Sequence, residues 1–473
     1  MASIQIATIT RRVTRVDVDE VTRLRARLSG SLLGPTDDGY DEARTIWNAM
    51  IDRRPALIAR CTSTADVQLA VDFANRFELL LAVRGGGHNI AGNAICDDGL
   101  VIDLSAMNFV RVDPKRKFAE VGPGATLGDL DRATQEFGLA TPVGINSTTG
   151  IAGLTLGGGF GWLSRAHGLT VDNLVGAEVV TASGAVVRVS DREHPDLFWA
   201  LRGGGGNFGV VTRFDFQLHE VGTEVLCGLV VYPLAQAPEA LRRYREIAAS
   251  LSDETAIWAV LRQAPPLPFL PAEVHGQEII AFAVCHIGDP DEGRRAIEPL
   301  RHLGTPYGEH LGVQPFIAWQ QAFDPLLTPG ARNYWKSHNF SELSDATIDV
   351  LVGYAGALPS PHCEIFVGQL GGKVNRVAPT ATAYAHRDAN YVVNVHGRWE
   401  TAAEDDRVIR WSRDFYRAAA PFATGGVYVN FMTEEESDRI RAAYGPNWDR
   451  LVRAKTKYDP GNLFSMNQNI TPR

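Results

Sequence analysis

His88 stands directly behind three glycines, residues 85–87, and its imidazole is expected to face whatever that loop holds. Glycines have no side chain, so the backbone N–H groups of such a run can close around a phosphate. A second glycine-rich run covers residues 150–161 (GIAGLTLGGGFG). Two such runs in one half of the chain predict a large, phosphate-bearing cofactor that is held by backbone, with the His88 imidazole facing it.

Composition narrows the class of protein. With 473 residues the chain is too long for one compact core, so we expect two domains. The formal net charge of −9 comes from dispersed acidic residues, which argues against nucleic acid as a partner. No apolar run approaches the ~20 residues of a membrane span, and the N-terminus is a poor secretory signal.

Five cysteines without a CxxC pair make a disulfide framework unlikely and favour a reduced, cytoplasmic setting. The twelve histidines show no metal-ligand spacing, so we expect no metal site.

Up to about residue 218 the pattern is one of short strands and helices. Residues 62–83 show helical spacing of apolar residues, with Thr64 as a possible cap, and then an apolar run that ends in the first glycine run. Segments 109–112 and 118–121 flank Asp-Pro-Lys-Arg and predict a hairpin. These short elements and glycine turns predict a mixed α+β domain.

From about residue 222 to 425 the elements are longer. We expect helices over 238–250, 290–303 and 403–420, and strands over 277–287, 363–370 and 390–399. This pattern predicts a second domain, an antiparallel sheet with helices on one face. The segment after residue 425 is interpreted as a return to the first domain.

Two glycine motifs that suggest nucleotide binding are rejected on their context. Residues 204–209 (GGGNFG) match GxGxxG, but a helix-like segment precedes them and an alternating strand follows, which reverses the dinucleotide-binding order. Residues 368–374 (GQLGGKV) lack the first glycine and the Ser or Thr of a P-loop. The glycines of 204–209 are therefore interpreted as a turn that also approaches the cofactor.

Seven stretches, in order along the chain, resemble one flavoprotein family. They are 84–92 (RGGGHNIAG), 99–105 (GLVIDLS), 148–163 (TTGIAGLTLGGGFGWL), 168–174 (GLTVDNL), 196–209 (DLFWALRGGGGNFG), 428–431 (YVNF) and 462–470 (NLFSMNQNI). As a set they resemble enzymes of the vanillyl-alcohol oxidase and berberine bridge enzyme-like type. No single stretch is specific by itself.

The resemblance implies FAD as the cofactor and an α+β fold in which a two-part PCMH-type FAD-binding domain is joined to an antiparallel-sheet substrate domain with helices on one face. The FAD-binding domain would cover residues 1–220, with its core at about 53–220. The substrate domain would cover 221–425. A berberine bridge enzyme-like segment, 426–473, would return to the FAD-binding domain.

The resemblance also implies that a ring nitrogen of His88 is bonded to the 8α-methyl of FAD. Many relatives carry a second bond, from a cysteine, and counting back from the second glycine run puts Asn146 at that position. Asparagine cannot form the thioether, so we expect a singly attached flavin and a more open site.

The residues that the resemblance assigns to FAD binding lie in the two glycine runs, in the segments after residues 167 and 208, and in the C-terminal motifs. They are Arg84, Gly85, Gly86, Gly87, His88, Asn89, Ile90, Thr148, Thr149, Gly150, Gly153, Leu154, Gly157, Gly158, Gly159, Gly161, Trp162, Gly168, Asp172, Asn173, Gly209, Val211, Tyr428, Asn430, Asn467 and Asn469.

Three residues are assigned to catalysis. Tyr428, on an expected strand with Asn430 on the same face, either abstracts a substrate proton or hydrogen-bonds the substrate. Gln369 is expected over the flavin as a binding and orienting group, and Glu364 is a weaker base candidate because strand parity puts it on the opposite face from Gln369. Thr149 matches the position at which relatives tune access of dioxygen, and its small side chain favours an oxidase.

The sequence therefore predicts an FAD-dependent oxidase that takes hydride from a C–H of a small organic substrate and returns the electrons to dioxygen, giving hydrogen peroxide. The substrate would bind between the domains. Natural-product tailoring is one possibility for its role. A dehydrogenase with another acceptor and a non-catalytic flavin- or ligand-binding protein remain alternatives, and both a monomer and a homo-oligomer stay open.

Overall fold

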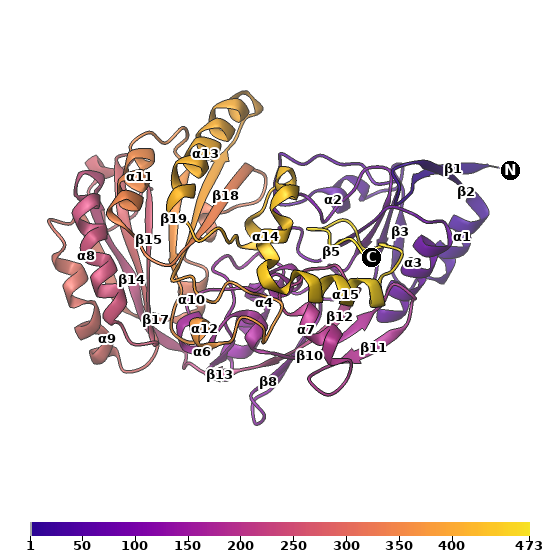
Figure 1. Ribbon diagram of the computed structural model, residues 1–473, viewed down its shortest axis with the longest axis horizontal. Coiled ribbons are helices and arrows are strands. Elements are labelled where there is room, and N and C mark those ends of the chain that lie inside the picture. Colours follow the sequence, from indigo (N-terminus) through magenta and orange to yellow (C-terminus); the bar gives the residue numbers. More distant parts are fainter. Residues whose placement is uncertain (1) are drawn as a thin grey trace.

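The computed structural model describes residues 2–473 and consists of two bodies joined by a broad contact (Figure 1). The first body holds both chain ends, and a four-stranded sheet within it has the order β3-β4-β6-β5. Its strands are β3 (Ser31–Leu33), β4 (Leu57–Arg60), β5 (Leu81–Arg84) and β6 (Leu100–Asp103). The central strand β6 pairs in parallel with both β4 and β5. Parallel pairing aligns the carboxyl ends of the strands, and His88 follows one of those ends.

A five-stranded antiparallel sheet lies beside the first one, in the order β11-β10-β12-β8-β7. Its strands are β7 (Val110–Asp113), β8 (Phe118–Val121), β10 (Leu174–Val180), β11 (Val186–Val189) and β12 (Val210–Gln217). The predicted hairpin is confirmed, because β7 pairs with β8 around the Asp-Pro-Lys-Arg turn. Two short pairs complete the body: β1 (Ser3–Ala7) with β2 (Val13–Asp17), and β9 (Leu139–Ala140) with β13 (His219–Glu220).

The second body is a seven-stranded sheet in the order β17-β14-β16-β15-β19-β20-β18, with every pair antiparallel. Its strands are β14 (Glu224–Pro233), β15 (Thr255–Gln263), β16 (Glu278–His286), β17 (Gly308–Pro315), β18 (Arg332–Phe340), β19 (Glu364–Gln369) and β20 (Tyr391–Trp399). The predicted strands at 277–287, 363–370 and 390–399 are confirmed. The expected α+β class, with an antiparallel sheet in its second half, is the fold observed.

Helices cover one face of this sheet (Figure 1). They are α8 (Ala237–Ser250), α9 (Pro290–Ile297), α11 (Asp345–Ala355) and α13 (Asp405–Ala419). Their apolar sides pack on alternate strand residues such as Ile257, Ile365 and Val393. The other face carries Trp258, Phe366 and their neighbours and packs against the first body. A strand alternates its side chains between two faces, so one sheet supplies both a helix-covered core and a wall for a site.

The remaining helices are short and belong mostly to the first body. They are α1 (Val18–Arg27), α2 (Tyr40–Arg44), α3 (Thr64–Arg76), α4 (Leu127–Gln135), α5 (Ile151–Leu156), α6 (Ser164–His167), α7 (Pro195–Leu201), α10 (Phe316–Gln320), α12 (Lys373–Arg376), α14 (Ile440–Tyr444) and α15 (Trp448–Tyr458). The predicted helix-then-strand order of 62–83 is confirmed by α3 and β5. The helix cap is Ser63, whose side chain accepts from Asp66 N, while the Thr64 hydroxyl bonds Glu178 instead.

The predicted helix-then-strand order around residue 204 is confirmed, since α7 precedes the glycines and β12 follows them. This is the reverse of the order in a dinucleotide-binding fold. The expected strand at Tyr428 is wrong. Residues Val429–Phe431 form a turn of 3-10 helix, which bends the chain so that Asn430 Nδ2 donates to the Tyr428 hydroxyl at 3.0 Å. On a strand, the side chains of Tyr428 and Asn430 would point to the same face and lie side by side. The 3-10 turn instead folds the Asn430 side chain onto the Tyr428 hydroxyl.

The C-terminal segment crosses back over the first body through α14 and α15 (Figure 1). Lys455 of α15 is fully buried and its ammonium group donates to Asp459 Oδ2 at 2.6 Å, to Asn207 O at 2.8 Å and to Phe464 O at 2.9 Å. One cation therefore joins the helix, the glycine-rich turn before β12 and the last residues of the chain. The glycine-rich turn before β12 and the segment around Phe464 both line the cavity described below.

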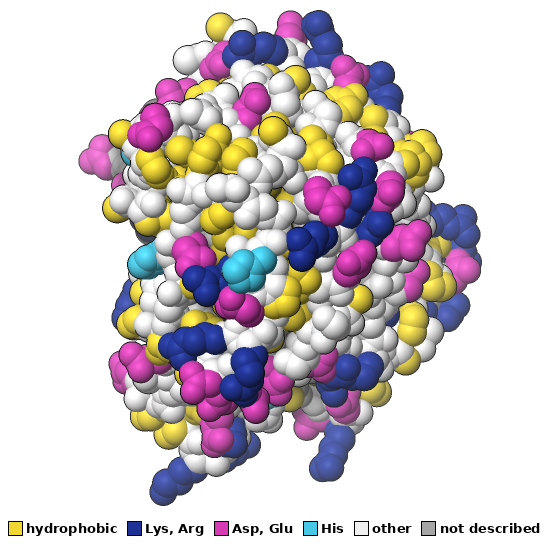
Figure 2. Space-filling model, turned by 90° about the vertical axis from the view of Figure 1, so that its left-hand side faces the viewer, with side chains coloured by type: hydrophobic (Ala, Val, Ile, Leu, Met, Phe, Trp, Pro, Cys, Tyr) yellow, Lys and Arg dark blue, Asp and Glu magenta, His cyan; other side chains and the backbone are white. Residues whose placement is uncertain are grey.

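The end of the molecule formed by the helices of the second body shows basic and acidic side chains interspersed (Figure 2). Several of them pair across helices, as Arg245 of α8 does with Asp345 at the start of α11, at 2.6 Å. Within residues 2–473, no helix combines the length and the apolar character that crossing a membrane requires.

Replacing Lys455 by methionine should lower the free energy of unfolding by about 3–5 kcal/mol, because Asp459 would be left as a buried, uncompensated charge. The matched control is Lys457→Met, which breaks the exposed Lys457–Asp196 pair and should change stability by about 0–1 kcal/mol. Denaturant unfolding of both variants measures the difference. Equal destabilisation by the two substitutions would contradict the anchoring role of Lys455.

Candidate active site

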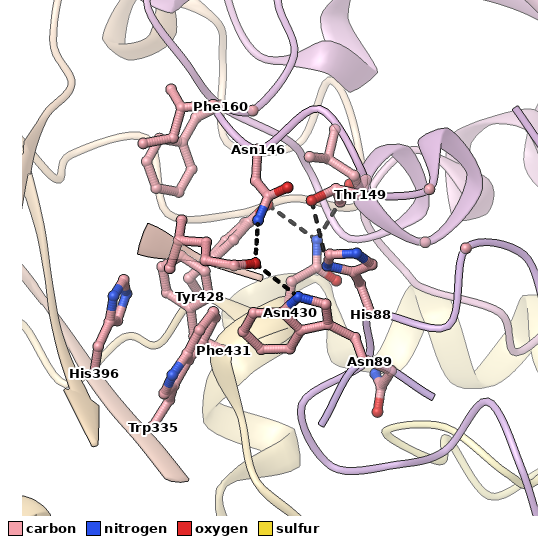
Figure 3. A pocket seen from close by; sticks show the side chains of 18 of the residues that line it. His88, Asn89, Asn146, Thr149, Phe160, Trp335, His396, Tyr428, Asn430 and Phe431 are labelled. Carbon is pink, nitrogen blue, oxygen red and sulfur yellow. Dashed lines mark hydrogen bonds between the residues drawn. The ribbon is translucent and has the colours of Figure 1, made fainter. Parts of the chain in front are cut away.

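A cavity lies between the two bodies, and segments from all parts of the chain line it. The first body contributes the loop after β5, residues 144–156 and the turn before β12; the second body contributes β14, β15, β16, β19 and β20; the C-terminal segment contributes 428–431 and 464–468. The cavity thus extends from the glycine runs to the aromatic face of the seven-stranded sheet (Figure 3).

The two glycine runs touch each other. A β-carbon on Gly86 would lie 2.5 Å from Gly150, and one on Gly150 would lie 2.4 Å from Gly86 N, so neither position has room for a side chain. Gly153 and Gly206 differ, because a β-carbon at either position would meet nothing within 4 Å. Both line the cavity and present bare backbone to open space. A large phosphate-bearing cofactor fits a floor of this kind.

His88 lies at the point where the two runs meet (Figure 3). Its Nε2 is 3.0 Å from the Thr148 hydroxyl and its Nδ1 is 3.5 Å from the Thr149 hydroxyl. The indole of Trp47 stacks on the imidazole with the ring centres 5.1 Å apart. Burial lowers the pKa of His88 to about 4, so the ring is neutral at neutral pH. A neutral imidazole has a lone pair with which it can attack an electrophilic carbon.

Tyr428 accepts hydrogen bonds from two sides. Gly159 N donates to its hydroxyl oxygen at 2.9 Å and Asn430 Nδ2 donates to it at 3.0 Å. Burial raises the pKa of Tyr428 to about 12, so the phenol is protonated at neutral pH. The group can hold the Gly159 turn and donate its own proton, and it is a weak candidate for abstracting one.

Polar side chains of three neighbouring strands form a row on the cavity side of the sheet. Arg262 of β15 lies opposite Glu364 of β19, and Glu364 lies opposite His396 of β20. The Arg262 guanidinium is 2.6 Å from Glu364 Oε2, and His396 Nδ1 is 2.8 Å from Glu364 Oε1. Burial by itself would raise the pKa of Glu364, but the charge of Arg262 and the His396 hydrogen bond outweigh it and bring that pKa to about 2.

Aromatic rings fill the space around this row. Phe160 from the second glycine run packs edge to face on Tyr428, with the ring centres 5.1 Å apart. Phe431 packs on Tyr428 in the same way, with the ring centres 4.8 Å apart. Trp162 stacks on Trp258 of the sheet at 4.1 Å. Such rings give a cavity flat apolar walls that fix the orientation of a ligand and keep water away.

The structure corrects the expectation for Gln369. Its Oε1 accepts from Ile257 N at 3.0 Å and its Nε2 donates to Ala248 O at 3.1 Å, so it is fully engaged on the helix-covered face. Glu364, five residues earlier on the same strand, faces the cavity. The parity argument was right that the two residues face opposite ways. The side that the resemblance assigned to Gln369, facing the cavity, is the one that Glu364 takes.

The other residues predicted to bind the cofactor divide into two groups. Those that line the cavity are Gly85, Gly86, Gly87, His88, Asn89, Thr149, Gly150, Gly153, Leu154, Trp162, Gly209, Val211, Tyr428, Asn430 and Asn467. Those that do not line it are Arg84, Ile90, Thr148, Gly157, Gly158, Gly159, Gly161, Gly168, Asp172, Asn173 and Asn469.

Residues of the second group shape the loops rather than line the cavity. A β-carbon on Gly161 would come within 1.7 Å of Val143 O, so this glycine permits a close backbone crossing. Asp172 pairs with Arg387 at 2.7 Å and accepts from Leu169 N at 2.8 Å, which joins the first body to the segment before β20. Those protein contacts occupy its carboxylate.

Several lining residues were missed from the sequence. Trp47 precedes His88 by a long stretch of chain, and no local pattern connects the two. Arg262 and His396 lie on strands that are otherwise largely apolar, and a polar residue inside such a strand is the signal that could have revealed them. Trp335 also lines the cavity, and its ring stacks on that of His396 with the ring centres 4.4 Å apart.

Comparison with known proteins defines the class. Residues 55–190 match an FAD binding domain, and residues 427–471 match the domain described as berberine and berberine like. Both fall on the segments that line the glycine side of the cavity. The protein is an FAD-dependent oxidoreductase.

Individual relatives narrow this further. The chain is 33% identical to an FAD-linked oxidoreductase of Dictyostelium discoideum, over 90% of this chain and 91% of that protein. It is 32% identical to the (R)-6-hydroxynicotine oxidase of Paenarthrobacter nicotinovorans, over 94% and 97% of the two. The crystal structure of 6-hydroxy-D-nicotine oxidase from Arthrobacter nicotinovorans superposes with a TM-score of 0.83 at 30% identity, covering 94% of this chain and 98% of that one. The chain belongs to the berberine bridge enzyme-like family of FAD-linked oxidoreductases.

Replacing Tyr428 by phenylalanine should destabilise the protein by about 1–3 kcal/mol, because Gly159 N would lose its buried acceptor. Turnover should fall by less than ~10-fold, since a protonated phenol is not the base. Denaturant unfolding and steady-state kinetics of Tyr428→Phe measure both effects. A loss of ~10²-fold in turnover with unchanged stability would instead identify Tyr428 as the base.

Proposed function

We propose that this protein is an oxidase whose FAD is bonded to His88 alone and whose small organic substrate binds in the cavity between the flavin and the seven-stranded sheet. The observation that carries the proposal is the neutral His88 imidazole at the meeting point of two glycine runs, beneath an aromatic wall. The bound flavin supplies the acceptor for the hydride that leaves the substrate C–H bond. The chain supplies binding, orientation and proton transfer.

Two features support attachment through His88. Its low pKa, about 4, keeps the imidazole neutral and nucleophilic at neutral pH. The hydroxyls of Thr148 and Thr149, one beside each ring nitrogen, can fix which nitrogen carries the proton and which keeps a lone pair.

Asn146 supports a single attachment. It lines the cavity, its Nδ2 donates to Leu327 O at 3.2 Å, and its Oδ1 accepts from Thr148 N at 3.1 Å. The side chain is thus engaged with backbone on two sides and has no thiol to offer. All five cysteines are buried and unpaired, and none of them lines the cavity that Asn146 lines.

The glycine floor and the C-terminal segment would hold the cofactor. Gly153 and Gly206 present bare backbone to the cavity, and Asn467 Oδ1 is a buried acceptor without a hydrogen-bond partner among residues 2–473. An unpaired buried oxygen is costly unless a ligand satisfies it. Asn467 therefore fits a donor group of the cofactor.

Thr149 supports dioxygen as the electron acceptor. It lines the cavity beside His88, and its side chain is small enough to leave a path toward the flavin. The oxidases among the relatives, such as the nicotine oxidase, point the same way.

Acid precipitation tests the covalent bond. Wild-type protein should give a yellow pellet whose flavin stays on the peptide that contains His88, whereas His88→Ala should give a colourless pellet. His275→Ala, which changes an exposed histidine, is the control and should stay yellow. A colourless wild-type pellet with free flavin in the supernatant would contradict attachment but not flavin binding.

Replacing Thr149 by leucine tests the oxygen path. The bulkier side chain should slow reoxidation of the dithionite-reduced flavin at least ~10-fold, equivalent to about 1.4 kcal/mol of added barrier. Stopped-flow mixing with air-saturated buffer measures the rate, and Thr149→Ser is the matched control that keeps the small size. Wild-type reoxidation that takes longer than minutes would favour a dehydrogenase.

A further inference from the structure

The polar row on the cavity side of the sheet contains one atom that its protein environment leaves without a partner. His396 Nδ1 is engaged with Glu364 Oε1 at 2.8 Å, whereas His396 Nε2 is buried and has no hydrogen-bond partner among residues 2–473. The residue is 8% exposed and its ring lines the cavity. A buried polar atom of this kind requires a partner, and the cavity is where a ligand can supply one.

The surroundings hold the ring still. Trp335 stacks on His396 with the ring centres 4.4 Å apart and the planes 16° apart, and Phe366 lies parallel on the strand beside it at 6.0 Å. Phe431 approaches edge-on at 6.4 Å (Figure 3). With the ring flanked by aromatic groups and tied at Nδ1, the free nitrogen has one fixed position.

We propose that His396 is the proton acceptor of the reaction, and that its Nε2 takes the proton of a hydroxyl group carried by a flat aromatic substrate. This inference rests on the proposed function, since it concerns the substrate side of the same cavity.

Glu364 is the positioning residue. Its carboxylate accepts a hydrogen bond from the Nδ1–H of His396, which leaves the lone pair on Nε2, and its negative charge stabilises the imidazolium that forms when Nε2 is protonated. Its pKa of about 2 keeps the carboxylate ionised and makes it too weak to act as the base itself. Arg262 holds the carboxylate from the other side at 2.6 Å.

Tyr428 is the other candidate for the proton acceptor, and its surroundings argue against it. Tyr428, one ring away from His396 through Phe431, is protonated at neutral pH because burial raises its pKa to about 12. The titratable and charged groups around His396 are then Glu364 of the adjacent strand, Arg262 beyond it, Arg398 on the same strand as His396, and the neutral Tyr428 from the C-terminal segment. Among these groups, the His396 imidazole is the one that lines the cavity with a buried nitrogen left without a hydrogen-bond partner among residues 2–473.

The aromatic walls define the body of the substrate. His88, Trp47, Trp335 and His396 form a continuous series of rings, with centres 5.1, 5.7 and 4.4 Å apart in turn. One wall therefore connects the histidine proposed to carry the flavin with the proposed base. A flat ring bound along that wall can present its hydroxyl to His396 while its C–H faces the flavin.

The proton and the electrons of the proposed oxidation can all be accounted for. The hydroxyl proton would go to His396 Nε2, the C–H hydrogen would leave with its electron pair, for which a bound flavin would supply the acceptor, and the electrons of the broken O–H bond would form the new double bond of the product. His396 returns its proton to water when the product leaves. Dioxygen, the acceptor already proposed, takes the two electrons from the flavin.

Binding of 4-nitrophenol to the flavin-loaded protein tests the inference without turnover, because the colour of this phenol reports its ionisation. In the wild type, the ionisation midpoint of the bound phenol should lie at least ~1 pH unit below that in His396→Gln, a tenfold change in the ionisation constant. In Glu364→Gln the ionisation midpoint of the bound phenol should lie closer to that in His396→Gln, because the imidazolium no longer has a carboxylate beside it. His362→Gln, at an exposed position, is the matched control and should behave as the wild type.

Two results would overturn the inference: the same midpoint in the wild type and His396→Gln, or failure of the wild type to bind 4-nitrophenol. Thermal unfolding and flavin absorbance show that each variant is folded and loaded. With a substrate found by anaerobic flavin bleaching, turnover of His396→Gln should fall by at least ~10²-fold, and a fall of a few-fold would also overturn the base role. Failure of the proposed oxidase function would be detected by other measurements, namely the colour of the acid-precipitated pellet and the rate at which dioxygen reoxidises the reduced flavin.

Discussion

The site depends on the close approach of two glycine runs. The backbone of Gly86 lies against that of Gly150 so tightly that a β-carbon on either would clash. Because the runs touch, His88 at the end of the first meets Thr148 and Thr149 at the start of the second. Backbone packing, which side-chain motion cannot loosen, therefore sets where the imidazole lies. The same lack of side chains leaves a floor on which a phosphate-bearing cofactor can rest.

The register of the seven-stranded sheet completes the site from the other side. Arg262, Glu364, His396 and Trp335 face one another in a single row across four neighbouring strands. A shift of one residue in any of these pairings would turn a member of the row to the helix-covered face. Burial and neighbouring groups fix the protonation state of two residues at the site: Glu364 stays charged because Arg262 and His396 outweigh its desolvation, whereas Tyr428 stays neutral because burial outweighs its hydrogen bonds to Asn430 and Gly159.

Much of the fold could be predicted from the sequence because its signals are local. Helical spacing predicted α3, turn residues predicted the hairpin of β7 and β8, and the long alternating segments predicted β16, β19 and β20. The expected strand at Tyr428 failed because its geometry is not local. Tyr428 accepts from Gly159, a residue far away in the sequence, and a turn of 3-10 helix brings Asn430 onto the same hydroxyl group. Alternation alone also could not tell which face of β19 meets the cavity.

The sequence by itself determined the class of protein, through the resemblance of seven collinear stretches to a known family. It also determined that position 88 carries an imidazole and that position 146 carries no thiol, because residue identity limits the chemistry that a loop can perform. The tertiary structure decided which residues meet across the cavity. It turned Gln369 to the helices and Glu364 to the cavity, put Asp172 in an ion pair with Arg387, and brought His396 between aromatic rings with a free nitrogen. Strand pairing and burial join residues that are distant in sequence, and no local pattern encodes the register or the desolvation that result from them.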